Sequence, residues 1–174
     1  MWGIYYFYGL KQAVKKMDVF TGTINAKMDA KGRVFVPASF RKILQSSGEV
    51  RFMLRKDVYK DCLILCLVST WKEKLADLRK RLDEWDEEEQ ALFRTISASV
   101  EPVELDSTGR LLIPRKYMLK LNISNSVCFV GMDNMIEIWS SDKLNEILMN
   151  SDDLKSHVRK FLSSSRRISE KADQ

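Results

Sequence analysis

Apolar and polar residues follow one another along this chain in patterns that predict short strands and short helices. Alternation rich in Thr and Ile predicts a strand within residues 18–28. Short apolar runs predict further strands at 50–54, 62–68, 100–105, 110–113, 127–131 and 135–139. Apolar residues at helical spacing predict helices that follow Pro37 and Pro114, and a last helix that begins near Ser141. These elements together predict an α+β fold.

One short stretch occurs twice, and the chain is organised around it. Residues 29–37 read DAKGRVFVP, and residues 106–114 read DSTGRLLIP. In each copy Asp can start a turn, Gly supplies the positive φ of a tight turn, and Pro suits the first position of a helix. The three apolar residues between Arg and Pro predict a buried strand. The repeat therefore predicts two hairpins, each with an Arg at its tip and each leading into a helix.

The region between the two copies has a helical pattern with no counterpart in the repeat. Thr70 and Glu73 have the spacing of a capping box, which predicts a helix start. An apolar stripe follows at helical spacing, formed by Trp71, Leu75, Leu78, Leu82 and Trp85. Asp86 and Glu89 predict the start of a second helix. The stripe is consistent with core packing and with a surface that faces a partner, and the sequence leaves both open.

These patterns predict how the chain is divided. A half-domain of this size buries too little surface to be stable alone, so the two repeats are expected to share one core. Residues 1–16 have no counterpart in the second repeat, which suggests an extension or a start at Met17. The expected segments are an extension (1–16), a first repeat (17–70), inserted helices (71–99), a second repeat (100–140), a C-terminal helix (141–163) and a disordered tail (164–174).

Composition narrows the functional classes. The 174 residues are 45% hydrophobic and carry a formal charge of +5, which permits a polyanionic partner. The basic excess lies on the first repeat. Three cysteines lie in apolar runs and are expected to be reduced core thiols, whereas His157, the only histidine, is expected on a solvated helix. No metal cluster, phosphate loop or nucleophile–base pair is recognisable, so no enzyme, cofactor or small-molecule substrate is expected.

The repeated Arg has two interpretations from the residues alone. Asp29 with Arg33, and Asp106 with Arg110, could form exposed ion pairs worth ~0–1 kcal/mol that hold each turn. The Arg fork also matches phosphate oxygens and guanine O6 and N7, which predicts a DNA-reading surface. The candidate site residues are Asp29, Gly32 and Arg33 with Lys27 and Lys31 nearby, and Asp106, Gly109 and Arg110 in the second copy.

The arrangement resembles the MraZ family, the transcriptional repressors of the division and cell-wall gene cluster. The resemblance covers roughly residues 19–160. It rests on Phe20-Thr21-Gly22, Met28-Asp29-Ala30-Lys31-Gly32-Arg33, Val36-Pro37, Phe40-Arg41, Asp61-Cys62-Leu63 before Trp71, Val103-Glu104-Leu105-Asp106, Gly109-Arg110, Leu112-Ile113-Pro114, Val130-Gly131 and Ile136-Glu137-Ile138-Trp139.

The resemblance implies two tandem AbrB/SpoVT-like swapped-hairpin β-barrel halves that form a pseudo-dimer within one chain. It implies a cytoplasmic, nucleoid-associated protein that forms ring-shaped homo-oligomers and binds repeated promoter sites on double-stranded DNA. The DNA-contacting arginine of the family falls on Arg33, and its second-copy equivalent on Arg110. The second turn has Ser107-Thr108 in place of Ala30-Lys31, so it is less basic.

Two other functions are compatible with the sequence. Swapped-hairpin proteins also include antitoxins and transition-state regulators, although a duplicated chain with inserted helices is unlike an antitoxin with a long toxin-wrapping tail. A protein-interaction module that uses the central amphipathic helices is the alternative from a different class. The apolar run within residues 1–16 is too short to span a bilayer and lacks the features of a signal peptide, so no membrane association is expected.

Overall fold

The computed structural model describes residues 19–172, apart from the side chains of 145–147 and 164–172. The predicted extension over 1–16 and the last two residues of the predicted tail lie outside this part. The described residues up to Ser141 form one compact unit, and those from Asp142 form a second. The first unit contains, in order, β1 (Thr23–Lys27), β2 (Arg33–Phe35), α2 (Ala38–Ser46), β3 (Arg51–Lys56), β4 (Cys62–Leu67), α3 (Val68–Arg81), α4 (Glu87–Ala98), β5 (Val100–Glu104), β6 (Arg110–Leu112), α5 (Arg115–Lys120), β7 (Ser126–Met132) and β8 (Met135–Ser140).

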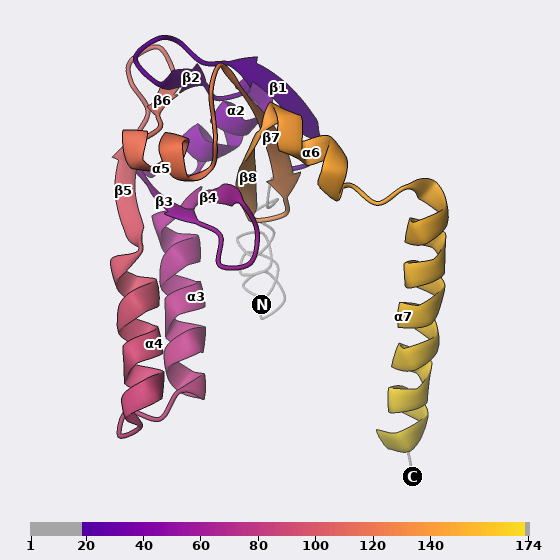
Figure 1. Cartoon of the computed structure of the whole chain (residues 1–174). Helices are drawn as coiled ribbons and strands as arrows, with labels where there is room; N and C mark the ends of the chain where they lie inside the picture. Colours follow the sequence, from indigo (N-terminus) through magenta and orange to yellow (C-terminus); the bar gives the residue numbers. More distant parts are fainter. Residues whose placement is uncertain (1–18, 173–174) are drawn as a thin grey trace, which may run out of the picture. The chain divides into compact units, whose positions relative to one another are not determined.

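Two antiparallel sheets make up the strand framework of this unit (Figure 1). Six strands form the larger sheet in the order β1-β7-β8-β4-β3-β5, and β2 pairs with β6 in a separate two-stranded sheet. Each of these strand pairs is antiparallel. The mixture of these sheets with the six helices of the described residues confirms the predicted α+β class. The strands lie within a few residues of the positions predicted from the apolar pattern.

The pairing exchanges strands between the two sequence repeats. β1 of the first repeat pairs with β7 of the second, and β5 of the second pairs with β3 of the first. At the centre, β4 pairs with β8, with Ile64 opposite Glu137. Because β1 to β4 correspond to β5 to β8, the order of the larger sheet is the same from either edge when the repeats are interchanged. The strand framework therefore has an approximate twofold symmetry in its connectivity.

One buried cluster contains residues from both repeats. On the larger sheet, alternate residues of β3, β4, β7 and β8 point into it, since successive side chains of a strand lie on opposite faces. Val34 of β2 and Leu111 of β6 enter the same cluster and are fully buried. α2 contributes Phe40 and α5 contributes Tyr117. The two-stranded sheet thus has one face against the core and one face outward.

The first inserted helix differs from the prediction at both of its ends. α3 begins at Val68, and no side-chain cap comes from Thr70, which is buried inside the helix. Instead, the Glu49 carboxylate accepts hydrogen bonds from the backbone N–H groups of Val68, at 2.6 Å, and Ser69. α3 ends at Arg81, so Trp85 is outside the helix and 88% exposed, and the predicted apolar stripe does not extend to it. Asp86 caps α4 as predicted.

The second unit contains α6 (Ser141–Ile147) from its second residue onward and all of α7 (Ser151–Ala172). The sequence predicted a single helix over 141–163. A new helix begins because Asn150 Oδ1 accepts hydrogen bonds from the N–H groups of Asp152 and Asp153, as an N-cap does. The helical backbone of α7 includes residues 164–172 of the predicted tail.

Candidate nucleic-acid interface

The first copy of the motif is a turn organised by one carboxylate. Asp29 Oδ1 accepts hydrogen bonds from the backbone N–H groups of Lys31 and Arg33, each at 2.9 Å. Asp29 Oδ2 accepts from Arg33 Nε at 2.7 Å and lies 2.7 Å from Arg33 Nη2. The Asp therefore fixes both the backbone of the turn and the direction of the Arg side chain. This explains why an Asp and an Arg at this spacing occur together.

The second copy repeats this geometry. Asp106 Oδ1 accepts from the N–H groups of Thr108, at 3.0 Å, and Arg110, at 2.9 Å. Asp106 Oδ2 accepts from Arg110 Nε at 2.8 Å. The Thr108 hydroxyl donates a further hydrogen bond to Asp106 Oδ1 at 2.7 Å, which Lys31 cannot provide in the first copy. The two sequence repeats thus form the same turn, with one additional bond in the second.

Each turn depends on its glycine and is joined to the other turn. Gly32 has a φ of +80° and Gly109 a φ of +82°, which residues with a Cβ rarely adopt. The Gly32 carbonyl accepts a hydrogen bond from Ile113 N–H at 2.9 Å, and the Gly109 carbonyl accepts from Val36 N–H at 3.2 Å. These reciprocal bonds extend the pairing of β2 with β6. The two turns therefore form one structure, not two independent tips.

We call β2 and β6 together the arginine ribbon, because its outward face carries both motif arginines. Val34 and Leu111 point inward, so the alternate residues point outward. Arg33 lies opposite Leu112, and Phe35 lies opposite Arg110. Phe35 and Leu112 are each 54% exposed. On the outward face, the two arginines thus alternate with two large apolar side chains.

The exposed Phe35 and Leu112 correct the sequence analysis, which treated all three apolar residues of each motif as buried. Strand alternation around Val34 would have identified Phe35 as outward, since the side chains of neighbouring residues point to opposite faces. The Arg110 guanidinium lies 5.7 Å from the centroid of the Phe35 ring, within the range of a cation–π contact. Phe35 therefore helps to define where the Arg110 guanidinium lies.

Arg33 is less exposed than its expected position at a hairpin tip suggests. Its side chain is 32% exposed, because it is the first residue of β2 and packs against Asp29. The ion pair uses Nε and Nη2. A guanidinium has five N–H donors, so the Nη1 donors and the second Nη2 donor are not used by Asp29. The end of the fork, which is the edge that can bind two acceptors of one guanine, stays available after Asp29 has oriented it.

The structure brings together the Asp, Gly and Arg of both copies but not all the predicted lysines. Lys31 is exposed in the first turn and lines a hollow of about 440 Å³ there together with Arg115, which the sequence analysis missed. Lys27 is exposed at the end of β1, outside the ribbon. Arg41, from α2, donates through Nη1 to the Thr108 carbonyl at 3.2 Å and supports the second turn.

Both Asp residues of the site are stabilised as carboxylates. The backbone N–H and then the side chain of Arg33 lower the pKa of Asp29 from 3.8 to about 2. The pKa of Asp106 is also lowered, first by the Arg110 N–H and then by the Thr108 hydroxyl. Both carboxyl groups are therefore ionised at neutral pH.

The cysteines and the histidine lie where the sequence analysis expected them. Cys62, Cys66 and Cys128 are free and buried, and burial raises the pKa of Cys62 to about 12. His157 is exposed on α7 with Nδ1 2.8 Å from the Asp153 carbonyl. Over the described residues, no cluster of His, Cys, Asp or Glu could hold a metal ion, and no helix is long and apolar enough to cross a membrane.

The fold and the site together define a class of protein. It is an α+β chain with an internal duplication and with two paired turns that each carry an arginine. The model of a family described as "MraZ protein, putative antitoxin-like" matches residues 19–94 and 98–161. The chain belongs to the MraZ family, as its doubled motif predicted.

Three similar relatives are each named "Transcriptional regulator MraZ". The protein of Bacteroides thetaiotaomicron is 42% identical over 85% of this chain and 95% of its own length. That of Bacteroides fragilis is 45% identical over 75% of this chain and 82% of its own length. That of Phocaeicola vulgatus is 38% identical over 86% of this chain and 97% of its own length.

Proposed function

We propose that this chain is a transcriptional regulator that binds double-stranded DNA through the arginine ribbon. The observation that carries the proposal is the placement of Arg33 and Arg110 on one outward face, each oriented by its own Asp. Orientation before binding lowers the entropic cost of a polar contact. A two-stranded β-ribbon has dimensions that fit the major groove, where an Arg fork distinguishes guanine from other bases. The names of the relatives support the regulatory role.

The alternation of arginines and apolar side chains on the ribbon suits base recognition better than simple phosphate binding. Phosphate contacts require charge and carry no sequence information. Phe35 and Leu112 place apolar surface between the two arginines, and apolar side chains contact the thymine methyl group in the major groove. Arg33 would provide the main base contact, with Lys31 and Arg115 on the phosphates beside it.

Further features of the proposal derive from the family. The two repeats would be AbrB/SpoVT-like swapped-hairpin halves of one pseudo-dimer, with 71–99 as an insertion. The protein would repress the division and cell-wall gene cluster, binding repeated promoter sites as a ring oligomer in the cytoplasm and nucleoid. The exchange of β1 and β5 between the repeats supports the swapped-hairpin assignment. Engagement of several repeats by linked subunits would raise avidity without new contacts at each site.

Selection of bound fragments from random duplex DNA by the purified full chain tests this function. We expect the selected fragments to share a short motif in spaced copies. We also expect binding to weaken as the salt concentration rises. Recovery of random sequences would contradict sequence-specific recognition, and the absence of any salt-dependent binding to duplex DNA would contradict a DNA partner.

A further inference from the structure

Trp85 lies in the connection between α3 and α4 with 88% of its surface exposed. Trp71 and Trp139, the other tryptophans in the described part of the chain, are buried. An aromatic side chain of this size buries about 150–250 Å² when it is covered, so leaving it in water forgoes a large stabilisation. We propose that this end of the α3–α4 hairpin is a docking site for a lysine- or arginine-rich segment of another protein.

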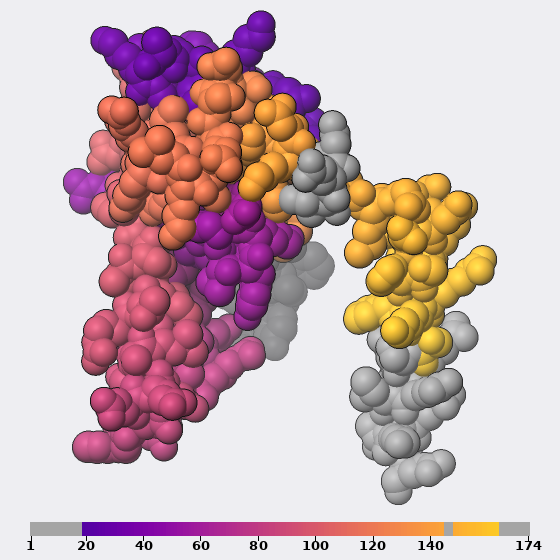
Figure 2. Space-filling model, viewed as in Figure 1, coloured from indigo at the N-terminus to yellow at the C-terminus, as the bar shows by residue number. Residues whose placement is uncertain are grey.

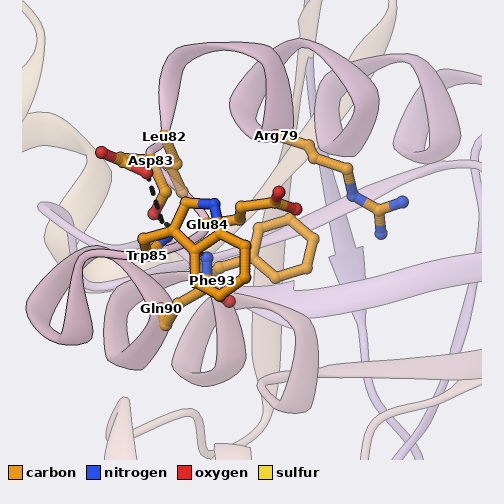
Figure 3. Close-up of a pocket in the computed structure, with 7 residues that line it drawn as sticks. All are labelled: Arg79, Leu82, Asp83, Glu84, Trp85, Gln90 and Phe93. Atoms are coloured by element: carbon orange, nitrogen blue, oxygen red, sulfur yellow. Dashed lines mark hydrogen bonds between the residues drawn. The ribbon is translucent and has the colours of Figure 1, made fainter.

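Trp85 borders a hollow of about 560 Å³ at the end of the hairpin (Figure 3). Leu82 and Phe93 supply further apolar surface to its lining, Asp83 and Glu84 supply carboxylates, and Arg79 and Gln90 complete it. An indole face beside carboxylates suits a cationic side chain, which gains a cation–π contact and an ion pair at once. The hollow is large enough to accept such a side chain with its apolar stem.

The connection that carries Trp85 is held in place by hydrogen bonds. Trp85 N–H donates to Asp83 Oδ1 at 2.9 Å, and Gln90 Nε2 donates to the Asp83 carbonyl at 3.3 Å. Asp86 Oδ1 accepts from Glu89 N–H at 2.9 Å and thereby fixes the start of α4. The exposed indole therefore extends from an ordered backbone, and a partner need not spend binding energy on ordering the connection.

Charge determines which kind of partner fits. Six of the seven residues in 83–89 are acidic, and Trp85 is the exception. Three basic residues end α3, namely Arg79, Lys80 and Arg81, so the connection and this last turn together remain negative. Arg79 is already engaged, with its guanidinium 5.1 Å from the centroid of the Phe93 ring. A negative surface repels nucleic-acid phosphates and attracts a basic protein segment.

The hairpin end is remote from the arginine ribbon within the first unit. The hairpin projects from the sheet as an arm, and its connection lies at the opposite end from β2 and β6 (Figure 1 and Figure 2). A partner bound at Trp85 would leave the ribbon uncovered. This inference therefore goes beyond the proposed DNA-binding function and does not depend on it.

Fluorescence anisotropy with a labelled peptide of alternating lysine and alanine tests the site on the full chain. We expect Trp85→Ala to weaken peptide binding by about tenfold or more. Glu84→Gln should weaken it by several-fold, whereas Glu88→Gln, the same charge change outside the hollow, should alter it by less than about twofold. Equal losses in the two Gln variants, or unchanged affinity in Trp85→Ala, would mean diffuse charge attraction and would overturn the proposal.

Two further measurements test the charge of the partner and the possibility of self-association. A peptide in which glutamate replaces every lysine should not bind, and tight binding of that peptide would contradict a cation site. Sedimentation of wild type and Trp85→Ala without peptide should give equal masses. A lower mass for the variant would assign the surface to a second copy of the chain and overturn a basic-protein partner. If Trp85→Ala fails to fold, the comparison of peptide affinity between Glu84→Gln and Glu88→Gln still tests the proposal.

Discussion

Arg110 Nη1 lies 3.8 Å from Asp29 Oδ2, although the two residues belong to different copies of the motif. Asp29 thus contacts its own Arg33 and also approaches the arginine of the second copy. Among the described residues, no equivalent ion pair joins Asp106 to Arg33. The two turns are therefore similar in sequence but unequal in structure, with Asp29 at the centre of the charged cluster.

This inequality predicts different results for two matched substitutions. Asp29→Asn removes a charge that orients Arg33 and influences Arg110, whereas Asp106→Asn affects only one of the two motif arginines, Arg110. Asn retains an oxygen that can accept the backbone N–H groups, so the turn should persist. We expect Asp29→Asn to reduce the preference for repeat-bearing duplex by about tenfold, as for one lost base contact. Asp106→Asn should reduce it less, and anisotropy titrations on duplexes with and without repeats measure both.

Asp29→Asn should lower the preference for repeat-bearing duplex without lowering the affinity for duplex that lacks repeats. Asp29→Asn makes the ribbon more positive, so its affinity for duplex without repeats should rise or stay constant. A variant that lost affinity for both duplexes equally would indicate general damage to the surface and contradict an orienting role for Asp29.

The lowered pKa of Asp29 predicts how stability depends on pH. The folded-state value is about 2, below the ordinary 3.8, so the carboxylate stabilises the fold above about pH 4. This contribution is lost as the pH falls through the folded-state value. The difference in melting temperature between wild type and Asp29→Asn should therefore be constant from pH 8 to about pH 5 and shrink towards about pH 2. A difference that grew on acidification would contradict the assigned ion pair.

The two motif glycines should tolerate Ala unequally. Both have positive φ, so each substitution should cost about 1–3 kcal/mol of unfolding free energy. A Cβ on Gly109 would lie 2.6 Å from Arg41 Cδ, whereas a Cβ on Gly32 would lie 3.0 Å from the more adaptable Met118 Sδ. Denaturant unfolding should show a greater loss for Gly109→Ala. Adding Arg41→Ala should recover part of that loss, and a strictly additive double variant would exclude the clash.

Adjacent leucines on β6 test the two faces of the ribbon. Leu111 is fully buried and Leu112 is 54% exposed. Leu111→Ala should lower the unfolding free energy by about 2–5 kcal/mol. Leu112→Ala should change it by less than about 0.5 kcal/mol while weakening the preference for repeat-bearing duplex. Equal destabilisation by the two substitutions would show that the outward face is covered and unavailable to DNA.

Much of the fold could be predicted from the sequence because local signals agreed with it. Apolar runs located the strands, and the duplicated motif located the two turns. The exchange of β1 and β5 between the repeats could not be derived from the pattern, since a strand's residues do not specify which edge it joins. The start of α3 could not be predicted from local sequence either, because its cap is Glu49, which is distant in sequence.

The candidate site was predictable in its residues and less so in its geometry. Asp29, Arg33 and their second-copy equivalents are identified by the repeat itself. The outward positions of Phe35 and Leu112 follow from strand alternation, but the apolar run suggested burial. The approach of Arg110 to Asp29 depends on the pairing of β2 with β6, a long-range contact that neither motif encodes alone.

Arg33→Ala, measured on a repeat-bearing duplex and on a matched duplex without repeats, tests the central claim most directly. The account predicts that the preference for repeats is lost, since one guanine contact is worth ~1–3 kcal/mol and linked subunits multiply it. Melting temperature should fall by no more than a few degrees, since the partly exposed Arg33–Asp29 ion pair contributes little to stability, and sedimentation should remain at the wild-type value. Lys31→Ala serves as the control, because it should weaken both duplexes alike and lower the salt dependence by about one ion. An Arg33→Ala protein that folds, assembles and still selects the repeats would contradict the account.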